Sequence, residues 1–389
     1  MTPALRRRAG AAACGVVLAL ALAACSGSSS AGSGGGAASG ARPSSTTGSA
    51  GVAGSLPAGG TSPHLPAALA PYAATVGGVL TGPAASARHL VYVPNQVSGT
   101  VQVIDPVSYQ VVDRFRVARS PEHVVPSHDL RTLWVNSDGG NTLTPIDPAT
   151  GTPGSPVSVP DPYNLYFSPD GAHALVMAER LREIEVRDPQ TMAAQRVIPV
   201  GCYGVNHADF TADLRTMVAS CEFSGELVVL DPGLTQVVKT VDLNAIPTPG
   251  ATDPAMARSM GGPAGYLRPG ASSMPQDVRL SPDGRSFLVA DMLRNGIWVV
   301  DATTLTVTRF VHTGKGAHGI YFSRDTRSAY VSNRDEGTIS VLDAQTLAQT
   351  ALWRIPGGGS PDMGGVIADG HELWLSGRYN SVVYVFDTT

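Results

Sequence analysis

The feature that most constrains this chain is a short pattern that recurs seven times: an apolar strand that ends in aspartate and is followed by a turn. The strands read VQVID, LTPID, IEVRD, LVVLD, IWVVD, ISVLD and VYVFD, and they end at Asp105, Asp147, Asp188, Asp231, Asp301, Asp343 and Asp387. Successive aspartates lie 41–44 residues apart, except for one spacing of 70, which is one period plus an insertion. A period of 40–45 residues built from short strands is typical of β-propeller blades. The pattern therefore predicts an all-β, seven-bladed propeller over residues 66–389.

The repeated aspartate has a local structural role. Its carboxylate can accept the backbone N–H two residues further on and close a turn into the next strand. Segments such as DPATG and DATTL fit this role. We therefore leave these aspartates out of the candidate site.

A second motif lies one strand earlier in the blades. Residues 330–333 read YVSN and residues 92–95 read YVPN. In these motifs the sequence resembles the YVTN family of bacterial β-propeller repeats, which is related to the YncE-type and cytochrome d1-type seven-bladed propellers. The resemblance covers about residues 66–389 and implies the same fold, but one fold hosts many activities.

The last repeat lacks an outer strand after Asp387, which would leave an open sheet edge. Residues 72–76 (YAATV) read as a strand followed by two glycines. We expect this segment to pair with the last blade as an N-terminal outer strand and to close the ring.

The N-terminus carries an export signal. Arg6, Arg7 and Arg8 precede an apolar run that is too short to span a bilayer comfortably, so residues 1–24 read as a cleaved signal peptide. The ending LAAC resembles the lipobox of bacterial lipoproteins, which implies that Cys25 is lipidated; an ordinary signal peptide cut nearby is the alternative. Residues 25–65 are rich in Gly and Ser and read as a flexible tether. An extracytoplasmic, lipid-anchored protein is predicted.

The charge of the chain argues against nucleic acid as a partner. Without the three signal-peptide arginines, the 27 basic residues become 24 against 31 acidic residues, and no basic cluster remains. Nucleic-acid binders need a basic footprint, so we expect no nucleic-acid partner.

Two cysteines remain in the repeats, Cys202 and Cys221. A hairpin between them places them across from one another. Outside the cytoplasm this favours a disulfide over free thiols or metal ligands.

The candidate site is what we call the channel mouth. It is the end of the ring where chain segments enter the innermost strands and where loops join the second strands to the third. Polar residues recur where each inner strand begins. They are Glu122, His123, Tyr163, Asn164, Asn206, His207, Gln276, Asp277, His318, Asp362 and Met363.

Two further expectations concern this mouth. His123, His207 and His318 come from alternate blades and could hold a transition metal as a cofactor; hydrogen bonding among channel-lining residues is the alternative. The insertion 246–272 is long for a loop, and it reads either as a lid over the mouth or as a loose excursion.

Function is predicted only broadly. The sequence favours a binding module at the cell envelope, with a protein, glycan or small ligand as partner. The alternative is an enzyme: a metal- or haem-dependent redox protein or a lactonase-like hydrolase, because relatives of this fold include haem-carrying propellers and lactonases. No catalytic residue can be named, since neither G-x-S-x-G nor H-E-x-x-H occurs.

Overall fold

The computed structural model describes residues 71–75, 80–247 and 268–389 of the chain. The predicted signal peptide, Cys25, the tether and most of the insertion lie outside the described residues. The chain divides into two units, Met1–Ser62 and Pro63–Thr389, and every described residue belongs to the second.

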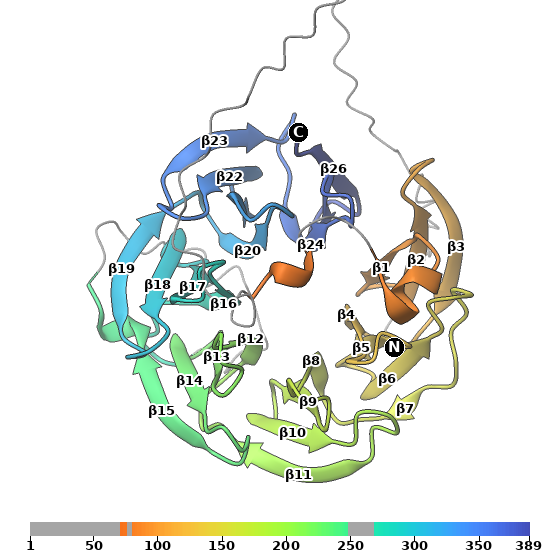
Figure 1. Cartoon of the computed structure of the whole chain (residues 1–389), viewed down its shortest axis with the longest axis horizontal. Coiled ribbons are helices and arrows are strands. Elements are labelled where there is room, and N and C mark those ends of the chain that lie inside the picture. The colour runs from red at the N-terminus through yellow and green to blue at the C-terminus, as the bar shows by residue number, and fades with distance from the viewer. Residues whose placement is uncertain (1–70, 76–79, 248–267) are drawn as a thin grey trace, which may run out of the picture. The chain divides into compact units, whose positions relative to one another are not determined.

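The second unit confirms the predicted propeller: seven antiparallel sheets form the blades of one ring (Figure 1). The first four blades contain β1 (Val91–Asn95), β2 (Thr100–Asp105) and β3 (Gln110–Arg116); β4 (Pro121–Pro126), β5 (Leu133–Ser137), β6 (Thr142–Ile146) and β7 (Val157–Ser158); β8 (Pro162–Phe167), β9 (Ala174–Ala178), β10 (Glu183–Arg187) and β11 (Ala194–Pro199); and β12 (Val205–Phe210), β13 (Met217–Cys221), β14 (Glu226–Leu230) and β15 (Val237–Asp242).

The remaining three blades continue the same meander. They contain β16 (Pro275–Leu280), β17 (Ser286–Asp291), β18 (Gly296–Asp301) and β19 (Val307–His312); β20 (Ala317–Phe322), β21 (Ser328–Asn333), β22 (Thr338–Asp343) and β23 (Gln349–Arg354); and β24 (Pro361–Val366), β25 (Glu372–Gly377) and β26 (Val383–Asp387). Short 3₁₀ turns are η2 (Ala73–Thr75), η3 (Gly82–Ser86) and η4 (Leu243–Ala245). Among the described residues no helix is long and apolar enough to cross a membrane.

The apolar core lies between neighbouring blades. One cluster joins blades 3 and 4, and others join blades 4 and 5, 5 and 6, and 6 and 7. The second strands of blades 3 to 6 are buried on both faces, and all five residues of β9 are inaccessible to solvent. The outer strand β3 is instead mostly exposed. This gradient explains why the apolar runs in the sequence mark the second and third strands most clearly.

The turn role of the seven aspartates is confirmed. Asp105 accepts from the backbone N–H of Val107 at 2.8 Å, and Asp387 accepts from that of Thr389 at 2.9 Å. The five aspartates between them accept in the same way, from the residue two positions on.

The predicted disulfide is confirmed as well. Cys202 and Cys221 are bonded, with their Cα atoms 6.0 Å apart, and both side chains are buried. The bond lies at the end of β13, one residue before the loop that reaches the channel mouth.

The predicted closing strand over residues 72–76 was wrong for the part that the structure describes; Val76 lies outside it. Ala73–Thr75 is a 3₁₀ turn, and β26 pairs only with β25 among the described strands. The Tyr72 hydroxyl donates to the Leu280 carbonyl at 2.9 Å, and its ring contacts Phe322 edge-on at 5.1 Å. Both partners end inner strands, so this segment lies inside the ring beside β16 and β20, at the end opposite the mouth (Figure 1). Two alanines give the segment little strand preference, and burial of the tyrosine decides its place.

The first and last blades meet through side chains instead. Tyr109 stacks on Trp374 with ring centroids 5.7 Å apart, and the Tyr109 hydroxyl donates to Glu372. At the mouth, Arg378 of blade 7 lies 3.3 Å from the Glu122 carboxylate of blade 2. Aromatic stacking and the hydrogen bond to Glu372 therefore bridge blades 1 and 7, while the ion pair joins blade 7 to blade 2 at the mouth.

Candidate functional site

The predicted mouth residues lie at equivalent positions near the beginnings of the inner strands. Each of β4, β8, β12, β16, β20 and β24 begins one residue before a predicted pair, so the pairs occupy the second and third positions of six strands. Side chains of pairs on neighbouring inner strands contact one another around the ring. The sequence register therefore located this layer of side chains correctly, while its role in ligand binding stays a prediction.

Blades 2 to 4 contribute two histidines in close contact. His123 donates from Nδ1 to the Tyr163 carbonyl at 2.9 Å, and its ring lies edge-on to that of His207 at 5.3 Å. Asn164 donates from Nδ2 to His207 Nδ1 at 3.2 Å. Because the Asn164 oxygen accepts from the Leu165 N–H, the amide orientation is fixed and His207 Nδ1 must accept. The proton of His207 therefore lies on Nε2.

Blades 6 and 7 contribute an ion-paired cluster around Asp362. Arg334 donates to Asp362 Oδ1 from both Nε, at 3.0 Å, and Nη2. His318 Nδ1 lies 3.4 Å from the same oxygen and 3.2 Å from the sulfur of Met363. Arg334 and Asp362 are 4% and 5% exposed, so this charge pair is held almost out of water.

The polar side chains of blades 4 and 5 complete the layer. Asp277 accepts at Oδ2 from Arg279 Nε at 3.1 Å and from the Ile320 backbone N–H at 3.0 Å. Asn206 donates from Nδ2 to Glu222 Oε2 at 2.8 Å, and Gln276 donates from Nε2 to the Met274 carbonyl at 3.4 Å. All of these side chains except Arg279 are buried.

Burial sets the charge states of the mouth. It lowers the pKa of His123, and it lowers the pKa values of His207 and His318 well below the usual range, so the three imidazoles are neutral at neutral pH. Burial raises the pKa of Glu122 and of Asp277, although Arg378 and Arg279 oppose these shifts.

The family model described as YNCE-like beta-propeller matches residues 49–247 and 248–389. The chain belongs to the YNCE-like β-propeller family. The uncharacterized protein YncE of Salmonella typhimurium is 22% identical over 294 residues, which are 73% of this chain and 76% of that protein.

Solved structures support the YNCE-like fold. Hydrazine synthase from Kuenenia stuttgartiensis matches with a TM-score of 0.62 and 17% identity, over 78% of this chain and 94% of that one. The β-propeller domain of Cps50 (Swd1) from Myceliophteria thermophila matches with a TM-score of 0.57 and 13% identity, over 77% and 93%. At these identities the likeness shows the fold alone.

The predicted metal site of this YNCE-like propeller finds no support in the geometry. Among the described residues, no three His, Cys, Asp or Glu side chains form a group that could hold a metal ion. The tautomer of His207 gives a physical reason. Its Nδ1 lone pair already accepts from Asn164, and its Nε2 carries a proton, so it presents no free lone pair beside His123 and His318.

Sequence reasoning missed a second ring of mouth residues in the YNCE-like repeats. The residue that directly follows the second strand of each blade begins a short loop, of four residues in blades 1 to 6 and of five in blade 7. From blade 1 to blade 7 these residues are Gln96, Asp138, Glu179, Glu222, Met292, Arg334 and Arg378. Acidic residues occupy blades 2 to 4 and basic residues occupy blades 6 and 7. Reading one position past each second strand would have found them.

Among the predicted mouth residues and the second ring, four side-chain atoms are buried without a hydrogen-bonding partner in the described structure. They are His207 Nε2, Asp277 Oδ1, Asn206 Oδ1 and Glu179 Oε2. Most buried polar groups in proteins are paired, because an unpaired one costs about 1–3 kcal/mol. The mouth therefore holds both donors and acceptors that a ligand could satisfy.

The described ends of the insertion lie on the mouth side. The backbone N–H of Arg268 donates to the carbonyl of Phe223, and its guanidinium lies 2.7 Å from Glu226. Phe223 lies in the β13–β14 loop of blade 4, and Glu226 directly follows that loop. Whether residues 248–267 form the predicted lid falls outside the described residues.

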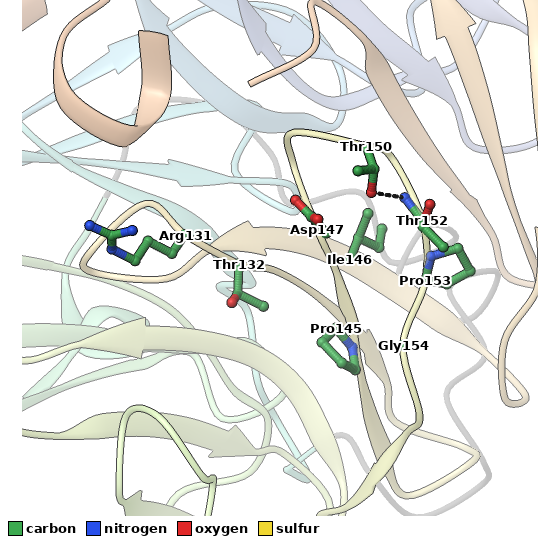
Figure 2. A pocket seen from close by; sticks show the side chains of 9 residues that line it. All are labelled: Arg131, Thr132, Pro145, Ile146, Asp147, Thr150, Thr152, Pro153 and Gly154. Atoms are coloured by element: carbon green, nitrogen blue, oxygen red, sulfur yellow. Dashed lines mark hydrogen bonds between the residues drawn. The ribbon is translucent and has the colours of Figure 1, made fainter. Parts of the chain in front are cut away.

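A shallow pocket on the outside of blade 2 involves none of the predicted residues. It lies between the β4–β5 hairpin and the β6–β7 connection (Figure 2). It is lined by Arg131, Thr132, Pro145, Ile146, Asp147, Thr150, Thr152, Pro153 and Gly154. No side-chain atom of this pocket is buried without a partner in the described structure, so the pocket offers a control surface for binding experiments.

Proposed function

We propose that this protein is a recognition module, held outside the cytoplasm by a lipid on Cys25, whose channel mouth binds a polar ligand of the cell envelope. The observation that carries the ligand-binding part is the set of buried, unpartnered polar atoms at His207, Asp277, Asn206 and Glu179. A ligand that pairs with these atoms regains hydrogen bonds that folding leaves unmade.

The rigidity of the surroundings supports recognition. The mouth residues stand at the beginnings of strands that belong to interlocked blades, and His123, Asp362 and Asn164 are each held by a hydrogen bond from or to a neighbouring blade. Groups fixed in this way lose little conformational freedom when a ligand binds. Selectivity then follows from the pattern of donors and acceptors.

The ligand-binding part is tested by retention. Full-length protein in detergent is incubated with a small-molecule and glycan extract of bacterial envelopes, washed, and analysed by mass spectrometry of what it releases. Wild type is expected to retain a compound that Asn206→Leu does not, because this change removes the unpartnered oxygen, together with the Nδ2 donor to Glu222, and keeps the side-chain volume. Thr132→Val alters only the pocket in Figure 2 and should retain the compound. Equal retention by wild type and Asn206→Leu would refute the mouth as the binding site.

The anchor is tested separately by mass spectrometry of the mature N-terminal peptide. An acylated cysteine at position 25 is expected. A mature chain that begins elsewhere, with an unmodified Cys25 or none, would overturn the lipid anchor and leave the propeller's binding role untouched.

A further inference from the structure

Carboxylates lie beside four arginines of the mouth. Each of these arginines is within ion-pair distance of at least one acid. The pairs are Arg180 with Asp161 at 2.6 Å, Arg279 with Asp277 at 3.1 Å, Arg378 with Glu122 at 3.3 Å, and Arg334 with Asp362. Asp138 lies 3.9 Å from the first of these arginines. Every one of these acids therefore has a positive charge within 4 Å.

Two acids of the second ring remain without such a partner. Glu179 and Glu222 occupy equivalent positions on adjacent blades, and neither lies within ion-pair distance of a cation in the described part of the chain. Burial raises the pKa of both carboxyls, and the charge of Glu222 adds to the shift of Glu179. Two neighbouring carboxyls that share a dry environment favour a bound positive charge.

An independent observation comes from Asn206, whose side chain is completely buried. Its amide nitrogen donates to Glu222 at 2.8 Å, while its oxygen has no partner. Because both atoms belong to one amide, the unpartnered oxygen lies beside the Glu222 carboxylate. Glu179 Oε2 is likewise buried without a partner. The cluster thus offers three acceptor groups and, among the described residues, no donor for two of them.

We propose that Glu179, Glu222 and Asn206 form the binding site for a primary ammonium group of the ligand. This inference rests on the proposed function and names the chemical class that the mouth recognises. An ammonium group has three N–H donors and one positive charge, which match three acceptors that include two carboxyls. Ca²⁺ would need six to eight oxygen ligands, and Mg²⁺ an octahedral set, so the three acceptor groups fit an ammonium better than a hard metal ion.

The first test uses wild-type, full-length protein and two simple probes. Methylammonium carries the three donors, whereas tetramethylammonium carries the same charge without any N–H. Titration followed by saturation-transfer NMR is expected to show methylammonium binding at least about tenfold more tightly, since charge-assisted hydrogen bonds account for that difference. Equal affinities, or displacement of methylammonium by millimolar Ca²⁺, would overturn the proposal.

The second test removes the acceptors one at a time. Glu179→Gln and Glu222→Gln each keep the shape of the side chain and remove its charge, and each is expected to weaken methylammonium binding about tenfold or more. The matched control is Glu336→Gln, an exposed acid in the blade 6 loop at the same end of the ring. The affinity of this control variant for methylammonium should change less than about twofold. Loss of binding in the control, or unchanged binding in both mouth variants, contradicts the site.

The retention experiment separates this proposal from the broader one. If the Glu179→Gln/Glu222→Gln double variant still retains the envelope compound, the ammonium site is refuted and the recognition role stands. If wild type retains no compound, the recognition role itself fails, whatever methylammonium does.

Discussion

The most demanding prediction concerns Asp362, which holds the basic side of the channel mouth together. Its carboxylate accepts two hydrogen bonds from Arg334, lies 3.4 Å from His318 Nδ1 and lies 3.9 Å from Arg378. Arg334 is only 4% exposed, and its remaining Nη1 contacts the sulfur of Met292 at 3.6 Å. Replacing Asp362 with alanine therefore leaves a guanidinium buried with no carboxylate beside it.

The cost can be estimated from this geometry. Removing one partner of a buried ion pair destabilises a protein by about 3–5 kcal/mol, whereas an exposed pair contributes about 0–1 kcal/mol. We expect Asp362→Ala to lower the free energy of unfolding by about 3 kcal/mol or more. Asp362→Asn keeps an acceptor for Arg334 and should cost less. The double change Arg334→Met with Asp362→Leu removes both buried charges and should recover most of the loss.

Urea unfolding followed by tryptophan fluorescence measures all three variants against wild type. The reasoning is refuted if Asp362→Ala costs less than about 1 kcal/mol, which is the value expected for an exposed pair. It is also refuted if the double variant is as unstable as the single one, since the loss would then not come from an uncompensated charge.

Three further predictions test other parts of the ring. Replacing Cys202 and Cys221 by alanine opens a loop of about 20 residues and should lower the free energy of unfolding by about 3 kcal/mol; no change in the urea midpoint would contradict this. Tyr72→Phe should cost about 1 kcal/mol by removing the bond to Leu280, and Tyr72→Ala should cost more; equal losses would mean that the ring contact contributes nothing. Burial raises the pKa of Asp138 to about 6, above its value in the unfolded chain, so its contribution to stability is present in acid and is lost as the pH rises from about 4 through 6. Asp138→Asn should remove this group's contribution to the pH dependence of the unfolding free energy, whose slope is at most about 1.4 kcal/mol per pH unit. An unchanged pH profile would refute the raised pKa of Asp138.

The sequence predicted the architecture well because the information is local and repeated. Asp301 and Asp343 each close a turn with the residue two positions on, and the same interaction recurs in all seven blades at one period. The disulfide between Cys202 and Cys221 followed from a hairpin whose turn was visible in the sequence. Both inferences depend on residues close together in the sequence, so neither needs knowledge of distant contacts.

The closing strand failed for the opposite reason. Tyr72 occurs once, in a segment with no repeat to compare, and its position is decided by Leu280 and Phe322, more than 200 residues away in the chain. No local pattern carries that contact. Strand propensity alone could not show that the side chain of Tyr72 would pack inside the ring.

The candidate site was predicted in part. The inner-strand register placed His207 and Asp277 in the mouth, but it could not show that Asn164 fixes the tautomer of His207. Glu179 and Arg334 were missed because each stands alone in a loop, and their opposite charges hide the shared position. Only the ring geometry shows that these residues meet.

The central claim, that the mouth recognises the ligand, is tested most directly by a crystal structure of the full-length protein with the compound it retains from the envelope extract. We predict that the compound lies at the channel mouth, with an amine nitrogen within hydrogen-bonding distance of Glu179, Glu222 and Asn206. A compound bound instead in the pocket of Figure 2, or on the outer strands with the mouth unchanged, would contradict the claim.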